Sequence, residues 1–432
     1  MSRSDSSLIP FLAHAVHSIR TSPPRIIASP PTQQRRAAVA LVLRVVPPPD
    51  YPLNEASSQP TSLQDFFELD WVNAPGARPE LLYLRRQKDS HSANGVANGK
   101  PILGTHNRSK DSHVAFPGGR MEDGDEDGLY TAMRQTWEEI GLDLAERSFT
   151  CIGQLDDREI TTSLGKRLLM VLSPFVFLQL APHTQPTDPP PETTLHWTPL
   201  STLMATKPAW STVTVDISSR LAPKGSFLRN LVQLLVGTMQ FDAIVLNETK
   251  DARMGSRSGP NGMAKKREGS NFVKFEVPNE KYDPSNARVW RRGLKDDEEQ
   301  LRLWGLTLGM TMDLMSHLKM PFQPSGLASP DGFIGGEMAV MAASMTSVFP
   351  RFSYPDVNFW IWVFGKRYRQ IIRGWEESLS AGSNDRRINW TGSALQAFYA
   401  AVRKALVVVI VLRALGIIAV LGFSGWWLFY RP

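Results

Sequence analysis

Apolar and β-branched residues gather in runs that predict strands. "RRAAVALVLRV" (35–45) has the continuous apolar character of a buried strand, and "ELLYLRRQ" (80–87) predicts a second one. "KRLLMVLSPFVFLQL" (166–180) predicts a third strand region, in which Pro174 indicates a sheet edge or a break because proline lacks the N–H that a ladder needs. Short strand-and-turn units are predicted at "HWTPLSTL" (196–203) and "FDAIVLNE" (241–248).

Two segments have helical spacing. "LRLWGLTLGMTMDLMSHL" (301–318) predicts a packed helix. A second helix is predicted from near Glu126 to Ile140, with Gly141 as its natural stop.

The N-terminal segment, residues 1–34, allows two interpretations. It is rich in Ser and Arg with one acid, which resembles a mitochondrial presequence. Its apolar positions between Ile9 and Ile19 also fit a short amphipathic helix that leads into the first strand, and we favour this second interpretation.

The C-terminal run 405–430, "ALVVVIVLRALGIIAVLGFSGWWLFY", is long enough to cross a membrane, for which about 20 apolar residues are needed. Trp426, Trp427 and Tyr430 would then lie at an interface. Arg413 is the single charge and requires a partner or a position near the interface. A transmembrane tail anchor is predicted, with the bulk of the chain cytosolic; a buried core helix is the alternative.

The remaining stretches are predicted to connect these elements. Disordered insertions are expected near 88–112 and 249–270, where apolar residues are few. Residues 319–400 are predicted to hold a Pro/Gly/Ser/Met linker and then a basic-aromatic segment, "NFWIWVFGKRYRQIIRGW" (358–375). This segment fits an anionic bilayer surface or a partly buried helix on the main domain, which spans 35–318.

Composition narrows the class of protein. The 432-residue chain has 42% hydrophobic residues, a net charge of +6 and a pI near 9.4, and its basic residues are spread out, so nucleic acid is not an expected partner. The single cysteine, Cys151, excludes an internal disulfide and a cysteine-based zinc site. The motifs of serine hydrolases, zinc proteases and P-loop proteins are absent from the sequence.

The chemistry of the chain is concentrated in "AFPGGRMEDGDEDGLYTAMRQTWEEIGL" (115–142). On the predicted helix, Arg134 is placed to pair with Glu138 one turn later, and an apolar stripe for packing is expected from Leu129, Met133, Trp137 and Ile140. Clustered carboxylates repel one another but suit a hard divalent cation such as Mg²⁺, which also binds diphosphate oxygens. Glycines 118 and 119 allow the backbone to turn tightly and approach a substrate.

This stretch resembles the Nudix box, with an acid pair in place of a single Glu and one extra residue in the spacing. The matching residues are Gly119, Arg134, Glu138, Glu139, Gly141 and Leu142. "LLYLRR" and "NRSKDSHVAFPGG", with Arg108 and Ser109, are similar to the upstream signature of the coenzyme A diphosphatase branch. The resemblance covers roughly residues 35–318 and implies an α/β/α sandwich around a mixed sheet.

The resemblance also implies residue roles. Catalysis would involve Glu138, Glu139, Arg134 and Gln135; Mg²⁺ or Mn²⁺ would be held by Glu138 and Glu139 with help from Asp125 or Glu126; substrate would meet Gly118, Gly119, Arg108 and Ser109. The expected reaction is cleavage of coenzyme A or acyl-CoA to adenosine 3′,5′-bisphosphate and a phosphopantetheine product.

One residue departs from the family pattern. Gln135 stands where the box has Glu, and its neutral amide can offer a carbonyl oxygen but cannot accept a proton at pH 7. A slower enzyme, an altered metal arrangement and an inactive membrane-tethered binding protein are therefore all open, as is a Nudix enzyme for another nucleoside diphosphate derivative. A peroxisomal or mitochondrial membrane fits a role with coenzyme A, and the endoplasmic reticulum remains open.

Overall fold

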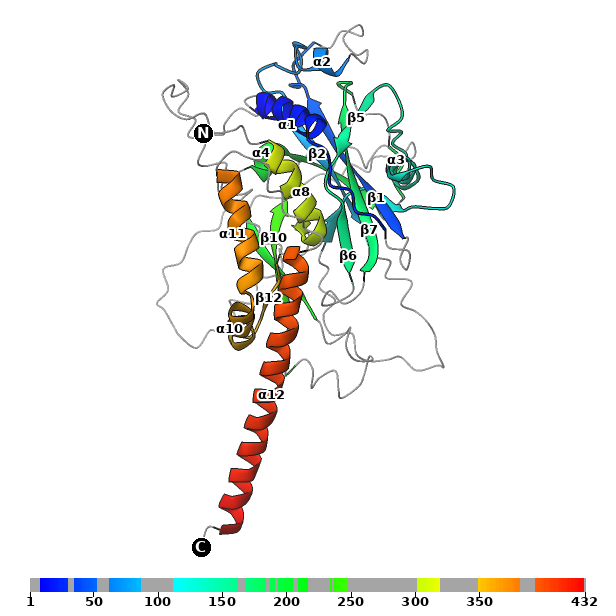
Figure 1. Cartoon of the computed structure of the whole chain (residues 1–432). Coiled ribbons are helices and arrows are strands. Elements are labelled where there is room, and N and C mark those ends of the chain that lie inside the picture. Colours follow the sequence, from blue (N-terminus) through cyan, green and yellow to red (C-terminus); the bar gives the residue numbers. More distant parts are fainter. Residues whose placement is uncertain are drawn as a thin grey trace, which may run out of the picture.

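Strand β1 (Arg36–Val46) lies inside a large mixed sheet in the computed structural model of the chain (Figure 1). Along one side it pairs in parallel with β7 (Leu168–Gln179), and on the other it pairs antiparallel first with β4 (Gly118–Arg120) and then with β2 (Arg78–Arg86). The structure describes residues 8–29, 35–52, 62–86, 112–161, 168–183, 187–190, 193–204, 209–216, 234, 237–246, 301–318, 349–380 and 393–430.

The described strands are arranged in the order β12-β10-β11-β3-β2-β1-β7-β5, with β4 beside β1, β6 beside β7, β8 beside β2 and β9 beside β10. The predicted strands at 35–45 and 80–87 are confirmed as β1 and β2. The other strands are β3 (Ser112–Ala115), β5 (Phe149–Gln154), β6 (Arg158–Thr161), β8 (Thr193–Pro199), β9 (Trp210–Val215), β10 (Met239–Leu246), β11 (Leu301–Trp304) and β12 (Arg351–Phe352).

Helices cover both faces of this sheet, which gives three layers (Figure 1). Side chains alternate along β1, so Leu41 and Leu43 face the core under α1 and α8, whereas Ala40 and Val42 face α3. The described helices are α1 (Ile9–Thr21), α2 (Leu63–Phe66), α3 (Gly128–Ile140), α4 (Leu200–Leu203), α8 (Gly305–His317), α10 (Pro355–Phe364), α11 (Lys366–Ser380) and α12 (Ser393–Tyr430).

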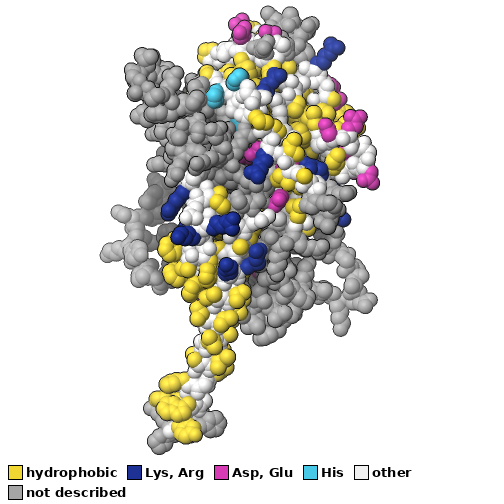
Figure 2. Space-filling model, viewed as in Figure 1, with side chains coloured by type: hydrophobic (Ala, Val, Ile, Leu, Met, Phe, Trp, Pro, Cys, Tyr) yellow, Lys and Arg dark blue, Asp and Glu magenta, His cyan; other side chains and the backbone are white. Residues whose placement is uncertain are grey.

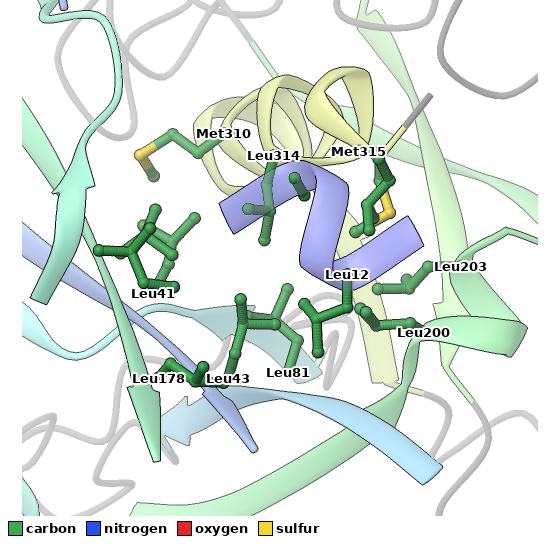
Figure 3. Close-up of a cluster of buried hydrophobic side chains, with 14 of the residues drawn as sticks. Leu12, Leu41, Leu43, Leu81, Leu178, Leu200, Leu203, Met310, Leu314 and Met315 are labelled. Atoms are coloured by element: carbon green, nitrogen blue, oxygen red, sulfur yellow. The ribbon is translucent and has the colours of Figure 1, made fainter. Parts of the chain in front are cut away.

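Helix α1 belongs to the main hydrophobic core. Leu12 points from α1 toward Leu81 of the sheet, with Leu200 of α4 beside it (Figure 3). Leu12 is 1% exposed, and full burial of such a side chain contributes about 2 kcal/mol. The favoured interpretation of residues 9–19 as an amphipathic helix leading into the first strand is confirmed.

The interpretation of Pro174 as an edge or a break is wrong. Strand β7 continues through Pro174, which pairs with Val39 of β1 on one side. On the other side, Pro174 lies where the partner changes from β6, which ends its pairing at Leu172, to β5, which starts at Phe175. Leu155 N–H donates to the Pro174 carbonyl there, so the strand tolerates an imino acid at a gap between two partners.

The segment 301–318 is not one helix. Its first four residues form β11, which pairs antiparallel with β10 and parallel with β3. Helix α8 begins only at Gly305, a residue with a φ of 62°. The sheet hydrogen bonds to residues far away in the sequence override the local helical spacing.

A second hydrophobic cluster forms the base of the molecule. Helices α10, α11 and α12 bury Val357, Ile361, Ile372 and Val402 together with residues of β10 and β12. The basic-aromatic segment is therefore two helices that meet at Gly365, and Phe349 and Phe352, within the predicted linker, are buried in the same cluster. The predicted insertions 88–112 and 249–270 lie almost entirely outside the described residues, as do 319–348 of the linker.

Helix α12 is longer than the apolar run that predicts it. Its first part packs on the base through Phe398, Val402 and Leu406, and its remainder projects away from the body (Figure 1). Residues 395–427 are long and apolar enough to cross a membrane by length and composition, and 11% of the most apolar window is buried. This low burial disfavours the alternative of a core helix, although one such helix is weak evidence for a membrane on its own.

Candidate active site

Helix α3 starts two residues later than predicted because Asp127 caps it. The Asp127 carboxylate accepts a hydrogen bond from Tyr130 N–H at 2.7 Å, which satisfies a donor of the first turn. At the other end Gly141 has a φ of 69° and its N–H donates to the Trp137 carbonyl, so the predicted glycine stop is confirmed. Asp125 and Glu126 consequently lie in the loop before the helix.

The packed face of α3 differs in part from the predicted apolar stripe. Ile140 is buried, and Leu129 and Met133 are partly buried against the sheet as expected. Trp137 is 57% exposed, so its assignment to the stripe is wrong. The small residues Thr131, Ala132 and Thr136 face the sheet in its place, which brings the helix close to β1.

Two glycines precede the helix in β4, which is bound to the first half of β1. Ala40 N–H donates to the Pro117 carbonyl, and Met121 N–H donates to the Arg36 carbonyl. Gly118 has a φ of 146°, and a Cβ there would lie 2.3 Å from the Ala38 carbonyl oxygen. A side chain at this position is excluded both by the backbone conformation and by the neighbouring strand.

The polar face of α3 lies directly against these glycines. A Cβ on Gly119 would lie 2.0 Å from Gln135 Oε1, so the Gln135 side chain occupies the space beside the Gly119 backbone. Gly118 N–H donates to Glu139 Oε2 at 3.2 Å. The side chain of Gln135 also donates from Nε2 to Glu138 Oε2 at 3.1 Å. The structure therefore brings Gln135, Glu138 and Glu139 together with the Gly118-Gly119 backbone.

Arg134 connects the helix to the preceding loop. Its Nε and Nη2 donate to the two carboxylate oxygens of Asp125, each at 2.7 Å, and its Nη1 donates to both oxygens of Glu138 at 3.0 Å. The predicted pairing of Arg134 with Glu138 is confirmed. Bidentate geometry of this kind fixes both partners.

Asp125 is held almost wholly by protein donors. Besides Arg134, it accepts from Thr131 Oγ1 and from Glu122 N–H, both at 2.9 Å, and its side chain is 2% exposed. The hydrogen bonds from Arg134 lower the pKa of the Asp125 carboxyl to about 2, and the same pair raises the pKa of Arg134. These contacts favour a role for Asp125 in positioning Arg134; direct metal binding by Asp125 remains a prediction.

Exposed carboxylates on α3 and in the loop before it supply hard oxygen donors. The Glu138 side chain is 51% exposed and that of Glu122 is 67% exposed, while Glu126 is also exposed. Within the described residues, no group of three or more His, Cys, Asp or Glu side chains is arranged to hold a metal ion. The oxygen donors nevertheless fit Mg²⁺ or Mn²⁺, because Mg²⁺ usually takes one or two carboxylates and completes its shell with water and phosphate oxygens.

The predicted site and the observed site differ in several residues. Arg108 and Ser109 are outside the described residues. Thr131 and Glu122, which hold Asp125 in place, were not predicted. A capping motif was available as a signal for Asp127, which stands three residues before Tyr130, whereas the contacts of Thr131 and Glu122 depend on how the loop folds back.

Comparison with known proteins bears on this region. Residues 91–214 match the family model for the NUDIX domain, and this range contains β4, α3 and all the residues of the box. The match supports the Nudix superfamily for this part of the chain. The mixed α/β architecture and its large mixed sheet are consistent with that assignment.

A curated relative is similar over part of its length. It is the "uncharacterized protein C14C4.10c" of Schizosaccharomyces pombe, 33% identical over 136 residues, which cover 31% of this chain and 41% of the relative. The chain thus matches well under half the length of this relative. A solved MutT/nudix family protein from Enterococcus faecalis is 12% identical over 46% of this chain and 57% of its own, with a TM-score of 0.21, a value too low to carry an argument.

Proposed function

We propose that this chain is a metal-dependent Nudix hydrolase that cleaves the diphosphate bond of coenzyme A or an acyl-CoA. The products would be adenosine 3′,5′-bisphosphate and the corresponding phosphopantetheine. The observation that carries the hydrolase proposal is the contact of Glu139 with the Gly118 backbone, with Gln135 against Gly119 and Glu138 bonded to Gln135. Gly118 lets β4 lie directly against β1, and Gly119 leaves room for the Gln135 side chain, so the two glycines set the position of the polar face of α3.

The contacts of the site residues indicate a different role for each of them. Asp125 holds the Arg134 guanidinium, and Arg134 in turn holds the Glu138 carboxylate. Glu138 and Glu139 would hold Mg²⁺ or Mn²⁺, with Glu126 or Glu122 available at the rim. A divalent cation bound here would neutralise diphosphate charge and polarise the phosphoryl oxygens.

Hydrolysis requires a proton acceptor for water, and Gln135 cannot supply one. Glu139 is the best placed carboxylate because it is half-buried and fixed by Gly118 N–H. In the proposed step the water oxygen bonds to phosphorus, the bridging phosphorus–oxygen bond breaks, and the water proton passes to Glu139. The leaving phosphate takes the bridging oxygen with its electron pair.

The choice of coenzyme A rests on sequence resemblance. It is supported by the "FPGG" start of the box, the acid pair, and the upstream segment that includes Arg108 and Ser109. The proposal also places the chain on a membrane through α12, with a peroxisomal or mitochondrial membrane favoured by the substrate and the endoplasmic reticulum as a further possibility.

One observation favours a second candidate. Gln135 fills the space beside Gly119 and donates to Glu138, a contact that a glutamate there would not make in its charged form. An inactive, membrane-tethered Nudix protein that binds a nucleotide derivative without turnover fits this arrangement.

A substrate panel separates these candidates. The full chain in detergent is incubated with coenzyme A, acetyl-CoA, ADP-ribose and a dinucleoside polyphosphate, each with Mg²⁺ or Mn²⁺, and the products are identified by mass spectrometry. Adenosine 3′,5′-bisphosphate from coenzyme A is the expected result. Turnover of ADP-ribose alone would establish a different Nudix substrate, and tight binding of coenzyme A without any product would favour the inactive binding protein.

A further inference from the structure

The base of the molecule combines an exposed aromatic face with a surplus of basic residues. On α10 the exposed side chains are Phe359, Trp362, Val363 and Phe364, with exposed fractions from 36% to 59%. These residues adjoin the point where α12 leaves the body, since α10 and α12 pack against each other. A hydrophobic surface of this kind at the foot of a projecting apolar helix requires a covering partner.

The basic residues around this hydrophobic surface indicate a negatively charged partner. Between residues 351 and 374 the sequence holds one acid, Asp356, and five basic residues, Arg351, Lys366, Arg367, Arg369 and Arg373; α12 adds Arg403, Lys404 and Arg413 and no acid. The projecting part of α12, residues 410–430, is called the stem below. Figure 2 shows Lys and Arg side chains gathered on the base of the body, directly above this hydrophobic stem. Glu376 and Glu377 follow on α11, one turn after Arg373 and about 15 Å along the helix from Lys366, so the surplus of positive charge belongs to the start of α11.

Arg413 fixes the level of this surface relative to the stem. Its guanidinium donates to Asp356 Oδ2 at 2.6 Å and lies 4.4 Å from the centre of the Tyr354 ring. Asp356 stands in the first turn of α10, so α10 begins at the same level as Arg413. The 17 helical residues after Arg413 extend about 25 Å, and the helix from Ile410 onward about 31 Å, which suits a hydrocarbon core of about 30 Å.

We propose that α10 and the first half of α11 form a membrane-contact surface that lies on an anionic bilayer around the emerging α12. Exposed Phe359, Trp362 and Phe364 would enter the headgroup boundary, and Lys366 and Arg367 would meet acidic lipid headgroups. The aromatic ends of the stem, Trp426 and Tyr430, would mark the opposite interface.

This inference is independent of the hydrolase proposal but depends on α12 as a membrane span. It has a consequence for orientation, because α3 lies on the right side of the body in Figure 1, away from the projecting part of α12. The residues of the Nudix box would then face the aqueous phase. A substrate dissolved in water could reach them without being embedded in lipid.

The test uses spin labels on the full chain with Cys151→Ser, reconstituted in phosphatidylcholine vesicles with or without phosphatidylserine. Labels are introduced singly by Trp362→Cys on α10, Val420→Cys on the stem and Trp137→Cys on α3; Trp362 and Trp137 are equally exposed, at 59% and 57%. Relaxation of each label is compared between oxygen, which is enriched in lipid, and a water-soluble nickel complex.

The expected result is that labels at 420 and 362 respond to oxygen, the latter more strongly with phosphatidylserine, whereas the label at 137 responds to nickel. A label at 362 that behaves like 137 while 420 responds to oxygen would overturn the contact surface and leave the span intact. A label at 420 that responds to nickel would overturn both. Burial of the 362 label in detergent, with a dimer in sedimentation, would assign the face to a second copy of the chain instead.

A variant with one reversed charge on α11 tests the contribution of its basic residues. Arg367→Glu should reduce the phosphatidylserine-dependent part of the response at 362 about fivefold, as expected for a basic residue near an acidic surface. Arg147→Glu, an exposed arginine outside the base, should leave it unchanged. Equal effects of the two variants would contradict a specific contact through α11.

Discussion

Two arginine–aspartate ion pairs lie in two different regions of this molecule. They differ in the burial of their side chains and not in the distance between their charged atoms. Arg134 and Asp125 are 2.7 Å apart with side chains 16% and 2% exposed, whereas Arg413 and Asp356 are 2.6 Å apart with side chains 25% and 45% exposed. The first pair lies in a network that includes Thr131 and Glu138, and the second joins the stem to α10 at the surface. Equal contact distances therefore predict unequal consequences, because solvent screens the exposed pair.

The largest structural effect is expected next to the buried pair, at Gly118. Gly118→Ala should destabilise the fold by about 3 kcal/mol, because the added Cβ would collide with β1 and the residue would keep a positive φ. Chemical denaturation measures this change. Gly124→Ala, in the loop that follows β4, is the matched control, since its Cβ would meet nothing within 4 Å. Equal stability of the two variants would show that β4 does not press on β1 as described.

Breaking the buried pair should have the next largest effect. Asp125→Asn should lower the free energy of unfolding by about 2 kcal/mol, because Arg134 keeps Glu138 but loses its bidentate partner in a largely buried place. It should also reduce turnover, since Glu138 would no longer be held in position. A variant with full stability and full activity would contradict the positioning role of Asp125.

The same pair predicts a pH dependence. The pKa of Asp125 is lowered from 3.8 to about 2, so its contribution to stability is complete above pH 3.8 and is lost as the pH falls toward 2. The stability difference between wild type and Asp125→Asn should be constant at neutral pH and shrink across this acidic range. Denaturant unfolding at several pH values measures it, and a difference that persists at pH 2 would disprove the lowered pKa.

Breaking the exposed pair should have the smallest effect. Asp356→Asn should change the stability of the body by about 0.5 kcal/mol, because an exposed ion pair contributes little in water. The comparison uses the same side-chain change as Asp125→Asn, so the two variants differ only in their surroundings. A loss as large as that of Asp125→Asn would show that the exposed pair does more than join α10 to the stem.

Local sequence signals account for the box helix and much of the sheet. The start and stop of α3 follow from Asp127 and Gly141, and the Arg134–Glu138 pair follows from helical spacing. The exposure of Trp137 could not be read from spacing, because small residues bring the helix face closer to the sheet. The contact of Arg134 with Asp125 joins α3 to the loop before it, where no periodic pattern applies.

Long-range pairing accounts for the other differences. Residues 301–304 form a strand because β10 and β3 are present beside them, and Pro174 fits an interior strand because its partner changes there. The apolar run 405–430 predicts a span, but the helix starts at Ser393 and buries Phe398 and Val402 against the body. A truncation near residue 400 would cut this cluster, so activity is best measured on the full chain.

The most direct test of the central claim compares Glu139→Gln with Gln135→Glu for hydrolysis of coenzyme A with Mg²⁺ and Mn²⁺. The account predicts that wild type turns over, that Glu139→Gln lowers kcat/KM by about 100-fold or more, and that Gln135→Glu retains activity. Thermal unfolding of each variant shows whether the fold is intact. Turnover by Gln135→Glu alone, with none by wild type, would contradict the account and leave a Nudix fold that binds without hydrolysing.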